Sequence, residues 1–348
     1  MKKALSKIFC TIPRSQKKFP YTKALASLAL GFLAAGILVF YFSSYSFAAV
    51  IDFFLSPFSS VFFFGSMLAS MSLLLVGSLG SSVALLSGNY NLGGEGQVYL
   101  GGLITALILS KLDIFFAPLL AIILVIIASA LLSFIPIILK LYRGASELLT
   151  SFLLSAALIP LIDWAIAIPL RNKGQNLLAT SPILARFEMT KILPPSSLSI
   201  VFFLSILLVF IAWRILYRTK EGELFRISGK AEEFSLYAGF KTKRYNIIAM
   251  SISGALHGLV GYIAVVSIHH TCHSGFYLGL GWNALSVALI AKSYPLLLIP
   301  ASFILAYLFS ASDYAVLFYS MPFNASFLIQ GIVLFAIAAS HIGGKKNG

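Results

Sequence analysis

The feature that most constrains this chain is a series of apolar segments separated by short polar stretches. The hydrocarbon core of a bilayer is about 30 Å thick and a helix rises about 1.5 Å per residue, so one crossing needs roughly 20 mostly apolar residues. With 59% hydrophobic and 10% charged residues, the chain is predicted to be an all-α, polytopic integral membrane protein. We expect about ten transmembrane helices, at residues 24–47, 61–87, 97–110, 115–139, 147–170, 197–217, 245–268, 281–291, 294–311 and 326–341.

The predicted organisation has three parts. Residues 1–23 form a basic cytoplasmic N-terminal segment without an acidic residue. The apolar run that follows is long enough to span the membrane, so we interpret it as a retained first helix and not as a cleaved signal. Residues 24–342 form a single transmembrane domain with a cytoplasmic loop at 218–244, and residues 343–348 form a cytoplasmic tail.

The distribution of positive charge predicts the orientation. Short cytoplasmic loops carry an excess of Lys and Arg. With ten crossings, twenty Lys and Arg fall on the side that holds both ends and five fall on the other side. Both ends are therefore expected in the cytoplasm. The net charge of +14 follows from this topology and from attraction to anionic lipid, and no nucleic acid is expected as a partner.

Two of the apolar segments, 97–110 and 281–291, are too short to cross the hydrocarbon alone, since about 14 residues rise about 21 Å. Splitting ten crossings into two halves gives each an odd number, so the second half runs through the membrane in the opposite direction. The sequence therefore predicts a 5+5 inverted repeat, with a short broken helix at the same place in each half.

A glycine-rich break precedes each short segment. The first reads Asn91-Leu92-Gly93-Gly94-Glu95-Gly96-Gln97, and the second extends from Gly275 to Asn283. Paired breaks of this kind indicate a transport pathway, whereas the alternative is close helix packing through small residues. The polar residues expected to line or gate the pathway, or else to cap broken helix ends, are Asn91, Glu95, Gln97 and Asn283.

These motifs, taken in order, carry a family resemblance. They are the Asn91 to Gln97 break, Ser253-Gly254-Ala255-Leu256 with Gly258-Leu259 and Gly261, His269-His270, Gly275-Phe276, Gly279, Gly281 and Val287-Ala288-Leu289. Together they resemble the permease subunits of bacterial ABC importers, in the branch for nucleosides and simple sugars that is related to ribose, galactose and branched-chain amino-acid permeases. The resemblance covers roughly residue 87 to the last helix.

The resemblance implies a function and partners. The chain is expected to pass nucleosides, purine nucleosides in particular, or simple sugars such as ribose or galactose across the bacterial inner membrane. An extracytoplasmic substrate-binding protein or lipoprotein would deliver the solute, and a second permease subunit, identical or homologous, would complete the path. A separate ATPase subunit would use ATP and Mg. The chain lacks a G-x-x-x-x-G-K-[ST] motif, so no catalytic residue and no bound cofactor of its own is expected.

The long basic loop at 218–244 contains a predicted short amphipathic helix, Ala231 to Ala238, with Phe234 and Tyr237 one turn apart. The resemblance implies that 229–239 is the coupling helix that contacts the ATPase. The alternative is an amphipathic loop that faces lipid. The candidate coupling residues are Gly229, Glu232, Glu233, Phe234, Tyr237, Ala238 and Gly239; Phe234, Ser235 and Leu236 depart from the Ala-Ala-Arg common in the family.

An ion-coupled secondary transporter of a small polar solute is the alternative function. Such proteins bury carboxylates as ion or proton sites, and the candidates here are Glu95, Glu147 and Asp163. The coupling-like loop argues against this alternative. An enzyme is not predicted, because the chain has no G-x-S-x-G motif and no paired carboxylates that flank a cleft.

A cluster of histidines occupies an external loop. His269 and His270 match the nucleoside branch and are expected at the outer mouth of the path, where imidazoles hydrogen-bond hydroxyls or a base; an ordinary polar loop is the alternative. No metal site is expected, because four potential ligands within five residues do not converge easily in one tetrahedral site. Loops 171–196 and 269–282 are expected to dock the binding protein. Cys10 and Cys272 fall on opposite sides of the membrane, so no disulfide is expected between them.

Overall fold

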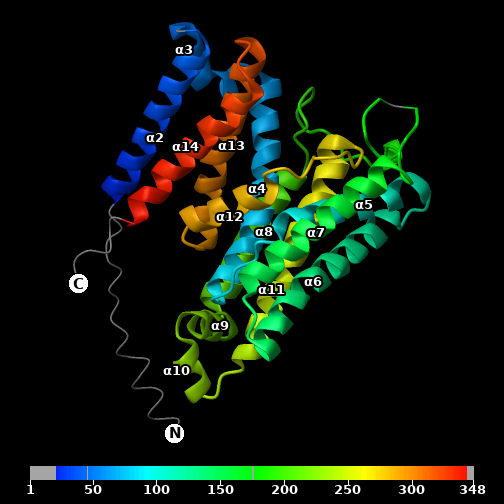
Figure 1. Cartoon of the computed structure of the whole chain (residues 1–348), viewed down its shortest axis with the longest axis vertical. Coiled ribbons are helices and arrows are strands. Elements are labelled where there is room, and N and C mark those ends of the chain that lie inside the picture. The colour runs from blue at the N-terminus through cyan, green and yellow to red at the C-terminus, as the bar shows by residue number, and fades with distance from the viewer. Residues whose placement is uncertain (1–20, 45, 175, 343–348) are drawn as a thin grey trace.

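The computed structural model describes residues 21–44, 46–174 and 176–342. The basic segment 1–20 and the tail 343–348, with Cys10, lie outside the described residues. The described part is helical and contains two isolated β-bridges but no strand, which confirms the predicted all-α fold (Figure 1). Its elements are α2 (Tyr21–Phe42), α3 (Phe47–Leu55), η1 (Ser56–Phe58), α4 (Val61–Leu86), α5 (Gly94–Lys111), α6 (Ala117–Arg143), α7 (Glu147–Ala167), η2 (Ala185–Phe187), α8 (Val201–Arg218), α9 (Lys220–Lys230), α10 (Glu232–Tyr237), α11 (Thr242–Ala264), η3 (Val265–His269), α12 (Leu280–Ile290), α13 (Pro295–Phe318) and α14 (Phe323–Ile342).

Every predicted apolar segment coincides with a helix. Within the described residues, six helices are long and apolar enough to cross a membrane: α4, α6, α7, α8, α11 together with η3, and α13. Two boundaries differ from prediction. The helix predicted at 24–47 ends at Phe42, and Ser46 accepts a hydrogen bond from the backbone N–H of Ala49 and so caps a separate helix, α3, that was not predicted. Helix α5 begins at Gly94, so Glu95 and Gln97 are helical residues and not part of a loop.

Helices α4 and α11 cross at the centre of the fold. Each of them packs mainly against helices of the other half of the chain. Helix α4 packs against α12 and α13, whereas α11 packs against α5 and α6. This exchange is the pattern that a 5+5 inverted repeat produces, since α4 and α11 hold the same place in the two halves. Helix α2 departs from the pattern and packs on α14.

Glycine permits the close approach of these central helices. A Cβ atom at Gly80 of α4 would lie 3.0 Å from the Ser253 carbonyl oxygen of α11, and one at Gly77 would lie 2.8 Å from the Ala284 Cβ of α12. Helix α6 meets α11 along a stripe that repeats every fourth residue, namely Ala121, Val125, Ser129, Ser133 and Ile137. Small side chains bring helices together where lipid gives no hydrophobic driving force between them.

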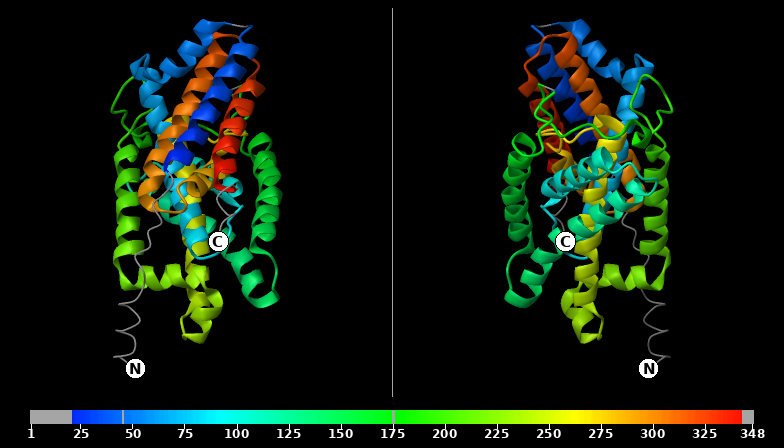
Figure 2. Two further views of the ribbon diagram at one scale, coloured as in Figure 1. Left: turned by 90° about the vertical axis from the view of Figure 1, so that its left-hand side faces the viewer. Right: turned by 90° about the vertical axis from the view of Figure 1, so that its right-hand side faces the viewer.

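Connecting elements lie at opposite ends of the molecule. Helices α9 and α10 project from one end, whereas α3 and the 168–200 loop lie towards the other (Figures 1 and 2). The helices between them expose large apolar side chains, such as Leu153 and Trp164 of α7 and Phe203 of α8. Exposed apolar surface of this kind suits a lipid environment, in which the bilayer replaces water.

Candidate functional site

The two short helices α5 and α12 meet with their N-termini at the centre of the fold. A Cβ atom at Gly281 would lie 2.5 Å from the Glu95 backbone nitrogen and 2.7 Å from the Gly94 carbonyl carbon. Glycine is therefore required at this contact. Each N-terminus has backbone N–H groups without helical partners and a partial positive charge, so the junction favours a carboxylate.

Glu95 supplies that carboxylate. It follows the first residue of α5, and its carboxyl group lies against the backbone N–H groups of Gly281 and Trp282 at the start of α12. The side chain is buried, and among the described residues its Oε1 atom has no hydrogen-bond partner. Glu95 therefore lies at the N-terminus of the opposite short helix and retains an oxygen that is able to accept a further hydrogen bond.

Asn91 and Gln97 form a buried amide network beside this junction. The Asn91 Nδ2 donates to Gln97 Oε1 at 3.0 Å and to the Ser253 hydroxyl of α11 at 2.9 Å. The Gln97 Nε2 donates to the Ser133 hydroxyl of α6 at 2.7 Å. Asn91 Oδ1 also accepts from the Gly93 backbone N–H, which holds the break itself. The bond from the Gly93 N–H to Asn91 is of the helix-capping kind, whereas Gln97 bonds the side chains of Asn91 and Ser133.

Replacing Gln97 with leucine is expected to destabilise the protein strongly. The change keeps a similar volume but removes the three hydrogen bonds that the Gln97 amide makes with Asn91 and Ser133, each of which contributes about 0.5–1.5 kcal/mol. Thermal unfolding of the purified protein in detergent measures the loss. The matched control is Gln330→Leu on α14, since Gln330 donates only to the nearby Ser326 hydroxyl at 2.9 Å. Equal melting temperatures for the two variants would contradict a structural role for the network.

His257 of α11 also reaches the junction, and sequence analysis gave it no role. Its Nε2 lies 3.2 Å from the Ser81 hydroxyl of α4 and its Nδ1 lies 2.8 Å from the Ser253 carbonyl oxygen. A Cβ atom at Gly94 would lie 2.9 Å from the imidazole Cδ2. The available signal was an ionisable side chain inside an apolar helix, which marks a functional candidate in membranes. Here both ring nitrogens are engaged, so the ring fixes the α4–α11 crossing.

An aromatic cluster forms where α5 meets the 269–282 loop. The Tyr99 ring of α5 lies 4.4 Å from the Tyr277 ring and 5.6 Å from the Phe276 ring, measured between centroids. The Tyr99 hydroxyl donates to Asp163 Oδ1 of α7 at 2.6 Å, and the Ser274 hydroxyl donates to the same oxygen at 2.7 Å. Asp163, an ion-site candidate from the sequence, is thus held by two hydroxyl groups. The cluster combines flat apolar faces with a hydrogen-bond acceptor.

The side chains of the adjacent residues His269 and His270 contact different partners. The His269 ring packs 4.9 Å from the His273 ring and 5.6 Å from the Phe276 ring, so it joins the aromatic cluster. His270 has a φ of 57°, and its Nε2 lies 3.8 Å from Glu188 of the 168–200 loop. Neither histidine is bonded to the amides or the carboxylate at the junction. Within the described residues, no three His, Cys, Asp or Glu side chains are placed to hold a metal.

The predicted docking loops lie together. The backbone N–H of Thr180 donates to the Cys272 carbonyl at 3.0 Å, and that of Ile183 donates to the His270 carbonyl at 2.9 Å. Cys272 is buried beneath this contact, and burial raises the pKa of its thiol, so the thiol stays protonated and unreactive. The described residues of loops 171–196 and 269–282 therefore form one continuous surface.

Asn283 lies on the α12 side of the helix junction. It is half-buried in the first turn of α12, where its amide nitrogen would be 2.9 Å from a Cβ atom at Gly279. The neighbouring Trp282 is 43% exposed and its ring lies 6.3 Å from the Phe152 ring of α7. The candidate pathway residues thus lie in different places. Asn91, Glu95, Gln97 and Asn283 lie at the helix junction, whereas His269 joins the aromatic cluster.

The predicted coupling helix is present as α10 (Glu232–Tyr237), but a helix that the sequence analysis did not anticipate, α9, precedes it. Tyr237 is 94% exposed and Phe234 is 60% exposed, whereas Ser235 is buried. The exposed candidates on this surface also include Glu232, Glu233, Ala238 and Gly239. Helix α10 therefore presents two aromatic side chains outward, which is the arrangement of a docking surface.

Gly229 connects this surface to the membrane helices. A Cβ atom at Gly88, which has a φ of 79°, would lie 2.8 Å from the Gly229 carbonyl oxygen, and a Cβ atom at Gly229 would lie 2.6 Å from the Ser87 carbonyl carbon. Backbone thus packs on backbone at the end of α4, a few residues before the first glycine-rich break. The contact with α9 therefore lies next to that break in the chain.

Known proteins are similar to this chain in sequence or in fold. The probable riboflavin import permease protein of Treponema pallidum is 35% identical over 290 residues, covering 82% of this chain and 77% of that protein. The guanosine ABC transporter permease protein of Bacillus subtilis is 25% identical over 273 residues, covering 76% and 78%. The solved structure of PsaBC from Streptococcus pneumoniae in complex with Fab has a TM-score of 0.50 at 14% identity, covers 84% of this chain and 95% of that one, and shows likeness of fold alone.

The profile of one protein family matches most of the chain. The family is described as branched-chain amino acid transport system / permease component, and the match covers residues 62–338. The apolar helices and this match agree on a multi-pass membrane protein that serves as a transport component. The chain therefore belongs to the branched-chain amino acid transport system permease family, as a membrane permease component.

Proposed function

We propose that this chain is the permease subunit of an ABC importer for nucleosides, purine nucleosides in particular, or for a related flat heterocycle that carries a hydroxylated group, such as riboflavin. The observation that carries the substrate class is the cluster of Tyr99, Phe276 and Tyr277 beside Asp163. Aromatic faces stack on a planar ring, and the carboxylate accepts hydrogen bonds from hydroxyls. The relatives named as a probable riboflavin import permease and a guanosine ABC transporter permease support this class. Ribose and galactose lack the ring and are the weaker candidates.

Family membership implies an ATPase and a substrate-binding protein as partners. In our proposal the ATPase binds α10 and hydrolyses ATP with Mg, while the permease itself binds no cofactor. A substrate-binding protein or lipoprotein docks on loops 171–196 and 269–282. A second permease subunit, identical or homologous, completes the path in the bacterial inner membrane, and both ends of the chain are cytoplasmic.

The transport mechanism we propose is alternating access. ATP-driven closure of the ATPase pushes on α10 and α9, and the Gly229 contact passes this force to the end of α4. Asn89, which follows Gly88 after the end of α4, accepts a hydrogen bond from Lys140 Nζ of α6 at 2.7 Å and donates one to Asn246 Oδ1 of α11 at 3.1 Å. In our proposal these bonds make α4, α6 and α11 move together. The junction of α5 and α12 then opens or closes, with Glu95 at its centre.

The ion-coupled alternative loses support from the carboxylates. Glu147 forms an ion pair with Lys140 at 3.0 Å, and Asp163 accepts from Tyr99 and Ser274. Both acids are held by local partners, so neither one offers a vacant site for a proton or an ion. The Glu95 carboxyl group lies against backbone N–H groups at the start of α12.

An uptake experiment tests the proposal. The chain is expressed with an ATPase and a substrate-binding protein of the same organism's importer, and uptake of radiolabelled guanosine, riboflavin, ribose and galactose is measured. We expect uptake of guanosine or riboflavin that requires ATP and persists when an ionophore removes ion gradients. Uptake that needs no ATPase and stops with the ionophore would establish the ion-coupled alternative. Transport of the sugars alone would overturn the heterocycle assignment.

A further inference from the structure

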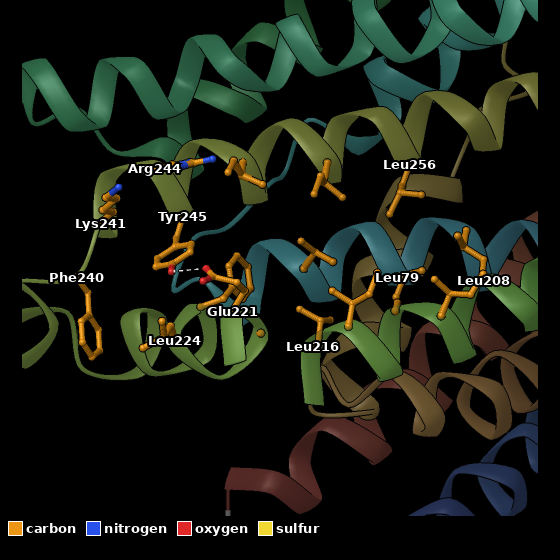
Figure 3. A pocket seen from close by; sticks show the side chains of 18 of the residues that line it. Leu79, Leu208, Leu216, Glu221, Leu224, Phe240, Lys241, Arg244, Tyr245 and Leu256 are labelled. Carbon is orange, nitrogen blue, oxygen red and sulfur yellow. Dashed lines mark hydrogen bonds between the residues drawn. The ribbon is translucent and has the colours of Figure 1, made fainter. Parts of the chain in front are cut away.

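A long apolar cleft of about 820 Å³ lies between α8 and α11. Both helices pack on α4 and on α9, which leaves the cleft between them, with α4 as its floor (Figure 3). Aliphatic side chains line its length, among them Leu79 of α4, Leu208 and Ile211 of α8, and Ile252 of α11. We refer to this feature as the α8–α11 groove.

The groove is open along its side. Ile211 and Ile252, on facing walls, are 47% and 42% exposed, so the cleft communicates with the surroundings of the helices and is not an enclosed cavity. Its wall on α11 extends from Arg244 to Leu256, which is about 18 Å of helix. Half of the hydrocarbon core measures about 15 Å. The apolar wall therefore matches the depth of one leaflet.

One end of the groove is positively charged. Lys241 and Arg244 line it and are exposed, and Figure 3 shows both at the end opposite Leu256. The acidic residue at this end, Glu221, accepts a hydrogen bond from the Tyr245 hydroxyl at 3.0 Å. This end lies beside α9 and α10, on the side that the charge distribution assigns to the cytoplasm. An anionic group at the membrane interface is the complement of such an end.

We infer that the α8–α11 groove binds an anionic phospholipid of the cytoplasmic leaflet, with one acyl chain along the aliphatic wall and the phosphate at Lys241 and Arg244. A hydroxylated solute does not fit, because the wall offers its hydroxyls no partners and burying them unpaired is costly. The cytoplasmic assignment rests on the proposed orientation; the binding itself does not depend on the substrate.

The bound lipid has a structural consequence. Gly239, Phe240 and Lys241 line the groove and form the link between α10 and α11. A lipid phosphate at Lys241 therefore restrains the segment through which the proposed coupling surface joins the membrane helices.

Lipid retention by the purified full-length chain tests the inference. The chain is reconstituted in nanodiscs of phosphatidylglycerol and phosphatidylcholine in equal amounts, transferred to mild detergent, and analysed by native mass spectrometry. We expect wild type to retain phosphatidylglycerol over phosphatidylcholine, and Lys241→Gln with Arg244→Gln to lower that retention at least about fivefold. The matched control is Lys243→Gln, because Lys243 lies over the Tyr142 ring, at 5.8 Å, and does not line the groove.

A second variant tests the acyl-chain site separately. Ile252→Trp fills the groove from an exposed position, so the protein is expected to fold and to lose bound phosphatidylglycerol although both cations remain. Equal retention of the two lipids by wild type, an equal loss in Lys243→Gln, or full retention by Ile252→Trp would overturn the inference. None of these measurements needs the ATPase or a transported solute, so failure here is distinguishable from failure of the proposed function.

Discussion

Gly281→Val is expected to abolish folding of the permease. A Cβ atom at this position would lie 2.5 Å from the Glu95 nitrogen and 2.7 Å from the Gly94 carbonyl carbon, and both are backbone atoms of the opposing helix. A flexible side chain could move aside, but here α5 and α12 must separate. Overpacking a core costs about 1–3 kcal/mol, occasionally more, and separation also uncovers N–H groups that lipid does not satisfy. The yield of monodisperse protein in detergent measures the effect.

Gly331→Val is the matched control for this prediction. Among the described residues, a Cβ atom at Gly331 of α14 meets nothing within 4 Å. The same substitution there is expected to leave yield and melting temperature close to those of wild type. If Gly281→Val gave the same yield as Gly331→Val, the close contact between the two short helices would be incorrect.

Tyr237→Ala, combined with Phe234→Ala, is expected to stop ATP-driven uptake without unfolding the permease. Both side chains are largely exposed, so their removal leaves the core of the fold unchanged. Aromatic anchors at the centre of an interface commonly contribute 2 kcal/mol or more each, which is roughly a thirtyfold change in affinity. We therefore expect loss of ATPase co-purification and at least about a tenfold fall in uptake. Charge reversal by Glu233→Arg is expected to act in the same direction.

Tyr142→Ala is the control for the coupling surface. Tyr142 is 69% exposed near the end of α6 and belongs to neither α9 nor α10. Its removal is expected to leave uptake and ATPase co-purification at wild-type levels. Unchanged uptake in both the combined Phe234→Ala and Tyr237→Ala variant and the Glu233→Arg variant would show that α10 is not the coupling surface.

Glycine and polar residues behaved differently as sequence signals. The glycine-rich breaks correctly located the short helices, because a helix start with its unpaired N–H groups needs close backbone approach or a polar cap wherever lipid surrounds the protein. The sequence could not separate a cap from a pathway residue. Asn91 is bonded to Ser253, which is 162 positions away along the chain. Only the packing of α11 against the break shows that this amide is already engaged, whereas Glu95 keeps a free oxygen.

The histidines and the coupling loop illustrate the same limit. Adjacent positions predicted a shared role for His269 and His270, but a left-handed backbone at His270 turns the two rings towards different partners. The short helix α10 followed from local spacing of Phe234 and Tyr237. Its connection to α4 through Gly229 did not, because that contact joins segments more than a hundred residues apart.

The sequence alone determined the membrane environment, the positions of the apolar helices, the two breaks and the family resemblance. Each of these depends on local composition, since every span must supply its own hydrogen bonds and its own apolar length to cross lipid. The tertiary structure alone decided which polar groups are consumed by packing, how the aromatic cluster forms beside Asp163, and where α8 and α11 leave a groove. Those properties depend on which helices touch, and helix contacts in lipid arise from the shape of small residues over the whole fold.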